Sequence, residues 1–338
     1  MITVSYVYDS AAVDKLSNNK AWLETYIPVV SGRLRNHGIE VRIDETENFD
    51  ILHIHLPLPL AQRMLKSDKP KVFHGHATEE TFMVGTWTRY WVRRLLLHFA
   101  KNSDIIICPS SSAAEYYRKH LPDKKIAVMS YGIDLEKYEF RESERKKFRE
   151  RFGISDDDIV ISCVGGFSKR KGIVEFFNVA KSLPDCRFMW VGGDYTHNTA
   201  VNLFYKIFAH AGEVSLKNLP PNVILTGYTR EVPAALSASD IFFFPSKQET
   251  LGLALVEAAA CSLPLVVSDI PVFREWLSDG EDCLMGTTEK KFAVHIAALV
   301  ANPELRQKLG KKARLAAEKH HDINSTAQEL AGLYKSLL

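Results

Sequence analysis

Short apolar runs alternate with amphipathic segments along the whole chain. We predict strands at residues 2–8, 39–43, 51–55, 71–74, 104–108, 126–129, 159–164, 186–191, 223–225, 241–244 and 264–267. Helical periodicity fills the gaps between them, for example over residues 173–182 and 292–300. Strands that alternate with helices favour parallel sheets covered on both faces, so the predicted fold class is α/β.

The alternation falls into two series, separated by residues 139–151, which are rich in Arg, Glu and Lys and carry no strand pattern. Tyr131-Gly132-Ile133-Asp134 is predicted to end the first domain, with a hinge after it. We therefore expect two doubly wound domains that face each other across a cleft, over residues 1–135 and 136–320. Residues 321–338 are expected to be helical and to pack back on the first domain. Ligands of such sheets bind beyond the carboxyl ends of the strands, which here means the cleft.

Composition narrows the possible functions. The 338 residues are 46% hydrophobic and 25% charged, as in an ordinary soluble protein, and the net charge of +2 provides no global field for nucleic acid. The five cysteines are scattered and odd in number, which indicates reduced thiols rather than a disulfide framework or a zinc site. No leader pattern and no apolar run of about 20 residues is present. We expect a cytoplasmic protein, free or on the inner face of a membrane.

The most informative stretch is residues 245–258, which read PSKQETLGLALVEA. An apolar strand runs into a polar loop that holds Glu249, and Gly252 then opens a helix with Glu257 in its second turn. A helix N-terminus offers unpaired N–H groups to a phosphate, and Gly252 lets the ligand approach them. Glu249 and Glu257 are placed to accept hydrogen bonds from hydroxyls on either side, which predicts a nucleotide-sugar site. Two glutamates eight residues apart are also common as solvated surface charges, so this alternative stays open.

A second motif follows the strand at residues 159–164. Gly165 and Gly166 clear space there, and Lys169, Arg170 and Lys171 bring three cations to the start of a helix. This combination suits a diphosphate. It is neither a P-loop nor a dinucleotide fingerprint. A surface turn with solvated lysines is the alternative interpretation.

These residues resemble the retaining glycosyltransferases of family 4, whose fold, called GT-B, has two Rossmann-like domains. The resemblance rests on three features. They are the turn of residues 165–172, which begins with glycine and ends with Arg-Lys-Gly, the Pro-Ser…Glu249-x7-Glu257 motif, and Tyr131-Gly132-Ile133-Asp134. More narrowly, the chain is similar to bacterial 1,2-diacylglycerol 3-glucosyltransferases. The residues that carry this similarity are His74-Gly75-His76-Ala77-Thr78-Glu79-Glu80, Arg170-Lys171-Gly172 and Asp269-Ile270-Pro271. It extends from about residue 72 to residue 338.

The resemblance implies a role for each site residue. Glu257 holds the ribose hydroxyls of a uridine nucleotide, Glu249 holds hydroxyls of the donor sugar, and Arg170 and Lys171 bind the diphosphate. His76, at the end of a first-domain strand, faces the sugar from the other wall of the cleft. The catalytic residues are then His76, Arg170, Lys171 and Glu249. The donor-binding residues are Gly165, Gly166, Arg170, Lys171, Glu249, Thr250, Leu251, Gly252, Leu253 and Glu257.

The histidine pair His74 and His76 also suits a metal, or two core-edge residues bonded to backbone. No third ligand is evident near them in the sequence, and the acidic run at residues 156–158 fits a solvated turn before a strand. We therefore expect neither a metal nor another cofactor.

The chain departs from the family pattern at two places. Many family members have an arginine where this chain has Gly166, so diphosphate binding rests on Arg170 and Lys171. The glycine pair usual in the loop after the first strand is absent, and residues 9–20 contain Ser17-Asn18-Asn19 instead.

The resemblance also implies a mechanism, namely transfer with retention of anomeric configuration. Retaining glycosidases use a nucleophilic carboxylate, but the predicted cleft offers no well-supported candidate. The family is described as reacting on one face, with a donor phosphate oxygen accepting the proton of the acceptor. Catalysis is then mostly electrostatic, because Arg170, Lys171 and the helix N-terminus stabilise the leaving nucleotide diphosphate.

The acceptor side is predicted from residues 82–103, which contain no acidic residue. Basic side chains alternate there with aromatic ones, and helical spacing places several on one face. Such a face suits the headgroup layer of an anionic membrane, whereas a core-facing helix with snorkelling arginines is the alternative. The run of Leu95, Leu96 and Leu97 is expected to face the core. The predicted membrane or acceptor residues are Trp87, Arg89, Trp91, Arg93 and Arg94.

The sequence thus predicts a peripheral membrane enzyme of glycolipid biosynthesis that moves glucose from UDP-glucose to diacylglycerol, with no nucleic-acid partner. Three alternatives remain open. One is a transferase of the same family with a soluble or polyprenyl-linked glycan acceptor. The others are a UDP-sugar epimerase and a binding subunit without activity.

Overall fold

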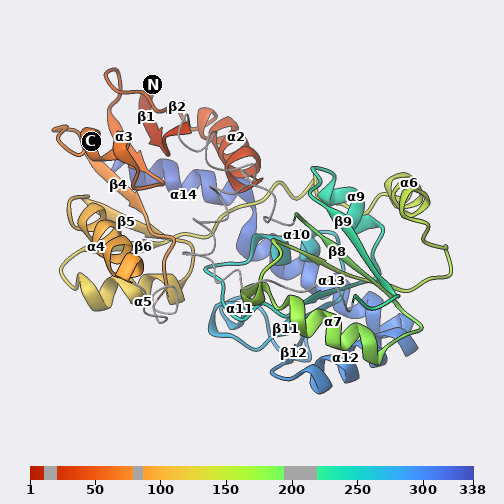
Figure 1. Ribbon diagram of the computed structural model, residues 1–338. Coiled ribbons are helices and arrows are strands. Elements are labelled where there is room, and N and C mark those ends of the chain that lie inside the picture. The colour runs from red at the N-terminus through yellow and green to blue at the C-terminus, as the bar shows by residue number, and fades with distance from the viewer. Residues whose placement is uncertain (11–20, 79–86, 194–218) are drawn as a thin grey trace. The chain divides into compact units, whose positions relative to one another are not determined.

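The computed structural model describes residues 1–10, 21–78, 87–193 and 219–338, with side chains from Tyr26 onward in helix α2 and from Tyr90 onward in helix α4. The chain divides into two compact units (Figure 1). The first unit comprises Met1–Ile133 and His321–Leu338, and the second comprises Asp134–His320. Each is built around its own parallel sheet.

The sheet of the first unit has strand order β2-β1-β3-β4-β5-β6, and all neighbours are parallel. Its strands are β1 (Ile2–Val7), β2 (Ile39–Ile43), β3 (Ile51–Ile54), β4 (Lys71–His74), β5 (Ile105–Cys108) and β6 (Lys125–Val128). The helices of the unit are α2 (Ala21–Arg35), α3 (Pro59–Met64), α4 (Trp87–Lys101), α5 (Ser111–His120) and α14 (Ile323–Lys335). The order reverses between β1 and β3, which marks a switch point where ligands of such sheets bind.

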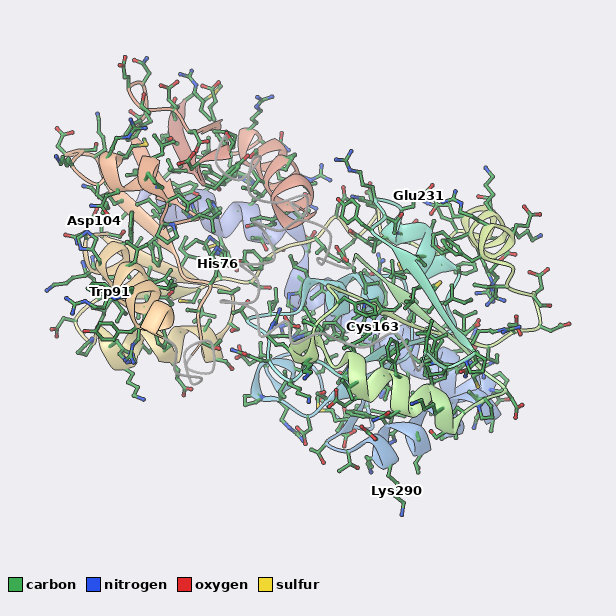
Figure 2. All side chains as sticks on the ribbon, in the orientation of Figure 1. His76, Trp91, Asp104, Cys163, Glu231 and Lys290 are labelled. Carbon is green, nitrogen blue, oxygen red and sulfur yellow. The ribbon has the colours of Figure 1, made fainter. Side chains whose placement is uncertain are left out.

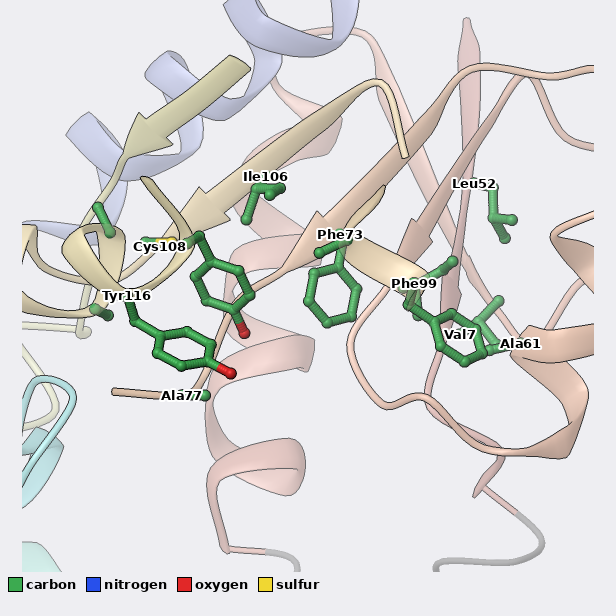
Figure 3. Packing of buried hydrophobic residues seen from close by; sticks show 14 of the residues in the cluster. Val7, Leu52, Ala61, Phe73, Ala77, Phe99, Ile106, Cys108 and Tyr116 are labelled. Carbon is green, nitrogen blue, oxygen red and sulfur yellow. The ribbon is translucent and has the colours of Figure 1, made fainter. Parts of the chain in front are cut away.

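Alternation along the strands gives this sheet two different faces. Leu52 and Phe73 lie in an apolar cluster with Phe99 of α4 (Figure 3). Ile54 and Ala114 of α5 belong to the same cluster. His53, one residue before Ile54, points to the opposite face and meets α14. The last helix therefore completes the first unit, and it packs against α2.

The second unit has strand order β12-β11-β10-β7-β8-β9, again with parallel neighbours. Its strands are β7 (Val160–Val164), β8 (Arg187–Val191), β9 (Val223–Gly227), β10 (Ile241–Phe244), β11 (Leu265–Ser268) and β12 (Leu284–Gly286). Its helices are α6 (Glu142–Phe152), α7 (Ile173–Ser182), α9 (Val232–Ser237), α10 (Leu253–Ala260), α11 (Pro271–Arg274), α12 (Glu289–Ala301) and α13 (Pro303–His321), with a 3-10 turn, η2 (Lys169–Lys171). The order reverses between β7 and β10.

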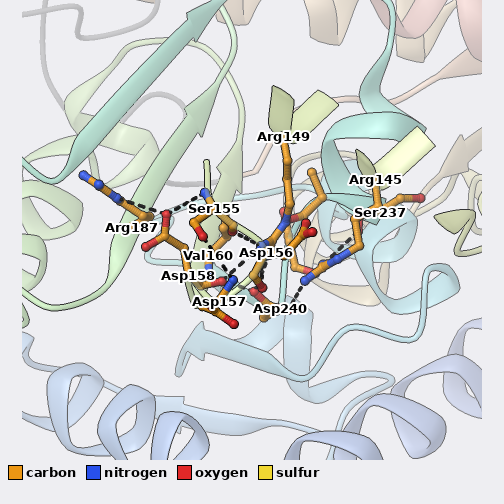
Figure 4. Close-up of polar contacts among 12 residues, drawn as sticks. Arg145, Arg149, Ser155, Asp156, Asp157, Asp158, Val160, Arg187, Ser237 and Asp240 are labelled. Atoms are coloured by element: carbon orange, nitrogen blue, oxygen red, sulfur yellow. Dashed lines mark hydrogen bonds and ion pairs between the residues drawn. The ribbon is translucent and has the colours of Figure 1, made fainter. Parts of the chain in front are cut away.

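The charged stretch between the two strand series forms helix α6, which packs on α9. Its Arg149 is 1% exposed although it is charged. Figure 4 shows its guanidinium beside Asp240, and the Arg149 NH2 to Asp240 Oδ2 distance is 2.8 Å. The same carboxyl oxygen accepts the backbone N–H of Val160 at 2.8 Å. Arg149 thus ties α6 to the start of β7, which no hydrophobic pattern could have predicted.

The α/β prediction is confirmed, since every predicted run is a strand, with ends shifted by at most two residues. The predicted helix at residues 173–182 coincides with α7. Strand β12 was missed because its three residues at the edge of the sheet are too few for a periodic signal.

Candidate active site

The second unit brings both predicted motifs to its switch point. β7 and β10 are hydrogen-bonded neighbours, so the turn after β7 and the loop after β10 leave the sheet at the same edge. Gly172, in the first of these, has a φ of +77°, and a Cβ on it would lie 2.1 Å from the carbonyl oxygen of Pro245 in the second. Glycine is therefore required for both backbone angle and space. It allows the two loops to touch.

Side chains then join the two loops around one carboxylate. Lys171 Nζ lies 2.6 Å from Glu249 Oε1, and the Ser246 hydroxyl donates to the same oxygen at 2.6 Å. Arg170 NH1 lies 3.6 Å from that oxygen and donates to the Gln248 carbonyl at 2.6 Å. We call Arg170, Lys171, Ser246 and Glu249 the donor cluster.

The charges in the donor cluster stabilise each other. Burial raises the pKa of the Glu249 carboxyl, but Lys171 and Arg170 outweigh this effect and bring the pKa below its ordinary value. Burial lowers the pKa of Lys171, and Glu249 opposes the shift. The Lys171 and Glu249 side chains are only 16% and 8% exposed, so attraction between charges is stronger here than in water. Two cations and one carboxylate thus lie together where little water reaches them.

Helix α10 begins where the sequence predicted it. Gly252 is its N-cap, with a φ of +89°, and a Cβ there would come within 3.1 Å of the Phe273 ring. Leu251 and Gly252 are buried, whereas Thr250 and Leu253 are partly exposed. The first N–H groups of α10 therefore start in the loop that carries Glu249.

Glu257 lies in the second turn of α10 and is held by a residue that sequence reasoning missed. The Tyr138 hydroxyl donates to Glu257 Oε1 at 2.6 Å. Burial raises the pKa of Glu257 to about 7, and the Tyr138 hydrogen bond and the charge of Lys137 limit the rise. Tyr138 is 119 residues away in sequence, so no local spacing could have revealed this contact.

The turn after β7 places Gly165 beneath Lys171. A Cβ on Gly165 would lie 3.6 to 3.8 Å from the aliphatic carbons of Lys171, so the lysine stem crosses this glycine. Lys171 Nζ also lies 5.2 Å from the centre of the Phe244 ring, a cation–π distance. Gly166 is partly exposed.

The first unit carries stacked histidine rings at the ends of β3 and β4. The ring centroids of His53 and His55 are 4.3 Å apart, those of His55 and His74 are 5.0 Å apart, and those of His74 and His76 are 4.7 Å apart. The Tyr131 hydroxyl is hydrogen-bonded to Nδ1 of His76, which Figure 2 labels. Burial lowers the pKa of His76 to about 4 and holds those of His53, His55 and His74 well below their usual range, so all four rings are neutral at pH 7.

No third ligand was evident near His74 and His76 in the sequence, but the fold brings two further histidines to His74. Ligand nitrogens of His53, His55 and His74 lie within 4.8 Å of one another. The sequence did contain a signal for this grouping. Alternation along a strand places His53 and His55 on the same face, and neighbouring parallel strands end at the same edge of the sheet, so the two histidine pairs can meet there. It was missed because the two histidine pairs are far apart in sequence.

Helix α4 presents part of the predicted basic and aromatic face. Tyr90 and Trp91 are 52% and 50% exposed, and the Arg94 guanidinium lies 5.6 and 5.7 Å from their ring centres. Trp91 is labelled in Figure 2. Arg93 instead hydrogen-bonds to His120 of α5. The side chains of Trp87 and Arg89 lie outside the described part of the chain.

The expectation that Leu95, Leu96 and Leu97 all face the core was wrong for one of them. Leu96 and Leu97 pack against the apolar cluster of the first unit, but Leu95 is 39% exposed. Leu95 follows Trp91 by four residues, so both lie on the same face of α4. Among the described residues, no helix combines the length and apolar character needed to cross a bilayer.

Other residues of the sequence motifs are placed as follows. Asp269, which precedes α11, pairs with Arg274 at the end of that helix through two contacts of 2.5 and 2.8 Å. Glu79, Glu80 and residues 11–20, including Ser17-Asn18-Asn19, lie outside the described residues.

Comparison with known proteins identifies the family. Residues 144–316 match "Glycosyl transferases group 1", and residues 23–137 match "Glycosyltransferase Family 4". The chain is 30% identical over 266 residues to the processive diacylglycerol alpha-glucosyltransferase of Acholeplasma laidlawii, covering 76% of each protein. It is 27% identical to a UDP-Gal:alpha-D-GlcNAc-diphosphoundecaprenol galactosyltransferase of Escherichia coli, over 74% of this chain and 63% of that protein. The chain belongs to the glycosyltransferases of group 1 and family 4 and is a transferase.

Solved structures confirm the fold. Sucrose-phosphate synthase from Thermosynechococcus elongatus matches with a TM-score of 0.78 at 16% identity, over 100% of this chain and 99% of the other. HepE from Anabaena, solved with UDP-glucose, matches with a TM-score of 0.77 at 16% identity, over 99% of this chain and 100% of the other. These likenesses establish the GT-B fold.

Proposed function

We propose that this enzyme transfers glucose from UDP-glucose to diacylglycerol, with retention of configuration, at the cytoplasmic face of the membrane. The observation that carries the donor half of the proposal is the donor cluster at the β7–β10 switch point. Two cations, a buried carboxylate and a helix N-terminus converge there, which suits a sugar linked to a diphosphate. The relative from Acholeplasma laidlawii, a diacylglycerol glucosyltransferase, supports the acceptor half.

In this proposal each side chain of the second unit has a defined task. Lys171 and Arg170 bind the diphosphate and stabilise the charge that grows on it as the glycosidic bond breaks. Glu249 accepts hydrogen bonds from sugar hydroxyls while it keeps Lys171 in position. Glu257, held by Tyr138, accepts from the ribose hydroxyls.

The lipid half of the proposal rests on helix α4. Tyr90, Trp91 and Leu95 expose aromatic and aliphatic surface, and Arg94 lies over both aromatic rings. Aromatic side chains with a neighbouring cation suit the headgroup region of an anionic bilayer. The acceptor would then be taken from the membrane surface.

A glycan acceptor carried on a polyprenyl diphosphate is the second candidate, favoured by the relative from Escherichia coli. The two candidates share the donor site and the membrane contact. They differ only in the molecule that receives the sugar.

The deciding experiment incubates purified protein with a panel of nucleotide sugars and anionic vesicles that contain diacylglycerol, an undecaprenyl-diphosphate glycan or neither, and it measures nucleotide release and the glycosylated product. We expect glucosyl-diacylglycerol from UDP-glucose only when the lipid is present. Transfer to an undecaprenyl-diphosphate glycan instead would support the second candidate. No turnover of any donor with any acceptor would contradict both.

A further inference from the structure

The histidine stack of the first unit contains an arrangement that donor binding does not use. His53, His55 and His74 each offer a ring nitrogen, these atoms lie within 4.8 Å of one another, and the three residues are at most 3% exposed. We propose that these three histidines form a binding site for a divalent transition-metal ion of the Zn²⁺ type.

The hydrogen bonds around the cluster decide which nitrogens are available. The Tyr334 hydroxyl donates to the Tyr6 hydroxyl at 2.9 Å, so its oxygen accepts the proton on Nδ1 of His53, 2.6 Å away. His53 Nδ1 is thereby protonated, and Nε2 keeps its lone pair. That lone pair points to His74 Nδ1 at 3.3 Å. His53 therefore presents Nε2 to the centre of the cluster.

The spacing of these two nitrogens fits a metal as well as a proton. Zinc binds imidazole nitrogen at about 2.0–2.1 Å, so two ligands of a tetrahedral ion lie about 3.3 Å apart. The His53 Nε2 to His74 Nδ1 distance already has this value. Binding then replaces the proton between the two rings with the ion, and that proton moves to Nε2 of His74. A ring nitrogen of His55 lies within 4.8 Å of the other two ligand atoms, and the His55 ring closes on the ion to supply the third nitrogen.

The chemistry of the side chains also favours a metal over simple packing. Imidazole nitrogen is a ligand that zinc and similar ions commonly take.

Tyr334 would act as an outer partner of the ion, that is, a residue that orients a metal-bound histidine without contacting the ion itself. A metal-bound histidine usually donates its other N–H to a fixed acceptor, which orients the ring. His53 does this toward Tyr334, which comes from α14 at the far end of the chain. An ion at this place would therefore link β3, β4 and α14, all within the first unit.

The test uses Co²⁺ as the probe, because tetrahedral Co²⁺ absorbs visible light strongly while hydrated Co²⁺ does not. The full-length protein is treated with a chelator, dialysed and titrated with Co²⁺, and Zn²⁺ is then added. We expect a visible band that saturates at one ion per chain and that Zn²⁺ removes. We also expect Zn²⁺ to raise the Tm of the wild-type protein, since a ligand that binds only the folded state stabilises it.

Variants assign the site. His55→Gln should weaken Co²⁺ binding by on the order of 100-fold or more, and Tyr334→Phe should weaken it by about 10- to 100-fold, as expected for an outer partner. The matched control is His98→Gln, an exposed histidine on α4 of the same unit, which should bind as the wild type does. Absence of the band in the wild-type protein would overturn the proposal even if a variant fails to fold. Equal Co²⁺ affinity of the wild type and folded His55→Gln would also overturn the proposal. The histidine rings would then serve only to pack the first unit.

Discussion

The Tyr138 hydroxyl donates a hydrogen bond to Oε1 of Glu257 over 2.6 Å, and both residues lie in the second unit. One neutral donor only partly offsets the desolvation of a buried carboxylate, so the pKa of Glu257 rises to about 7. Ribose hydroxyls at the same carboxylate would add donors and favour its ionised form. The protonation of Glu257 and the binding of the donor are therefore expected to be coupled.

This coupling predicts a pH-dependent KM for the donor. As the pH falls through about 7, Glu257 takes up a proton and accepts fewer hydrogen bonds, so the KM for the nucleotide sugar should rise while kcat changes less. Initial rates at several donor concentrations and pH values measure this. In Glu257→Gln the KM should be raised and lose this pH dependence. Glu304→Gln, an exposed glutamate on α13, should retain the wild-type profile.

The same shift predicts the stability of the unliganded protein. The folded-state pKa of Glu257 is raised from 4.5 to about 7, so its stabilising contribution is present below pH 4.5 and lost as the pH rises through 7. Glu257→Gln should therefore raise the Tm at pH 8 by at least about 2 °C and change it little at pH 4.5. Thermal unfolding at both pH values tests this. A variant less stable than the wild type at pH 8 would show that the ionised carboxylate of Glu257 does not destabilise the folded protein at that pH.

Lys171→Ala should slow the transfer without abolishing the fold. A charge-assisted hydrogen bond is worth roughly 1.5–3 kcal/mol, so its loss from the transition state should lower kcat/KM by about 10- to 150-fold. Steady-state kinetics with saturating acceptor give the ratio. Lys169→Ala is the matched control, because Lys169 lies in the same turn but is exposed, and it should stay within about threefold. A loss below threefold for Lys171→Ala would remove Lys171 from the proposed role.

Arg94→Glu should weaken binding to anionic vesicles. Arg94 lies over the exposed rings of Tyr90 and Trp91, and each basic residue near an anionic surface contributes about 1 kcal/mol, so charge reversal should cost roughly tenfold or more. The double variant with Arg93→Glu should lose more. Vesicle co-sedimentation measures the partition, with Lys66→Glu as a control of equal charge change on an exposed residue of the same unit. Equal binding of the folded Arg94 and Lys66 variants would exclude α4 as the membrane contact.

Arg149→Met should destabilise the second unit. The guanidinium is buried and donates to Asp240 and to the carbonyl of Ala238, so its removal leaves polar groups unpaired at the joint between α6 and the sheet. We expect the free energy of unfolding to fall by about 3 kcal/mol. Arg187→Met is the control, because Arg187 lies 3.4 Å from Asp158 and its side chain is 44% exposed. Its removal should change the free energy of unfolding by less than about 1 kcal/mol. Urea unfolding of both variants gives the comparison, and equal losses would contradict the role assigned to Arg149.

The sequence by itself determined the α/β class, nearly all strand positions and the start of helix α10 at Gly252, because each depends on the local order of residues. Alternating apolar runs specify strands, and Gly252 before an apolar helix marks an N-terminus that needs no distant partner. Lys171 and Glu249 were found separately, each from its own motif. The tertiary structure decided that they pair, through the adjacency of β7 and β10. It also brought Tyr138 to Glu257 and His53 and His55 to His74. These contacts join residues far apart in the chain, and local spacing carries no information about such partners, because only the packing of strands and helices brings them together.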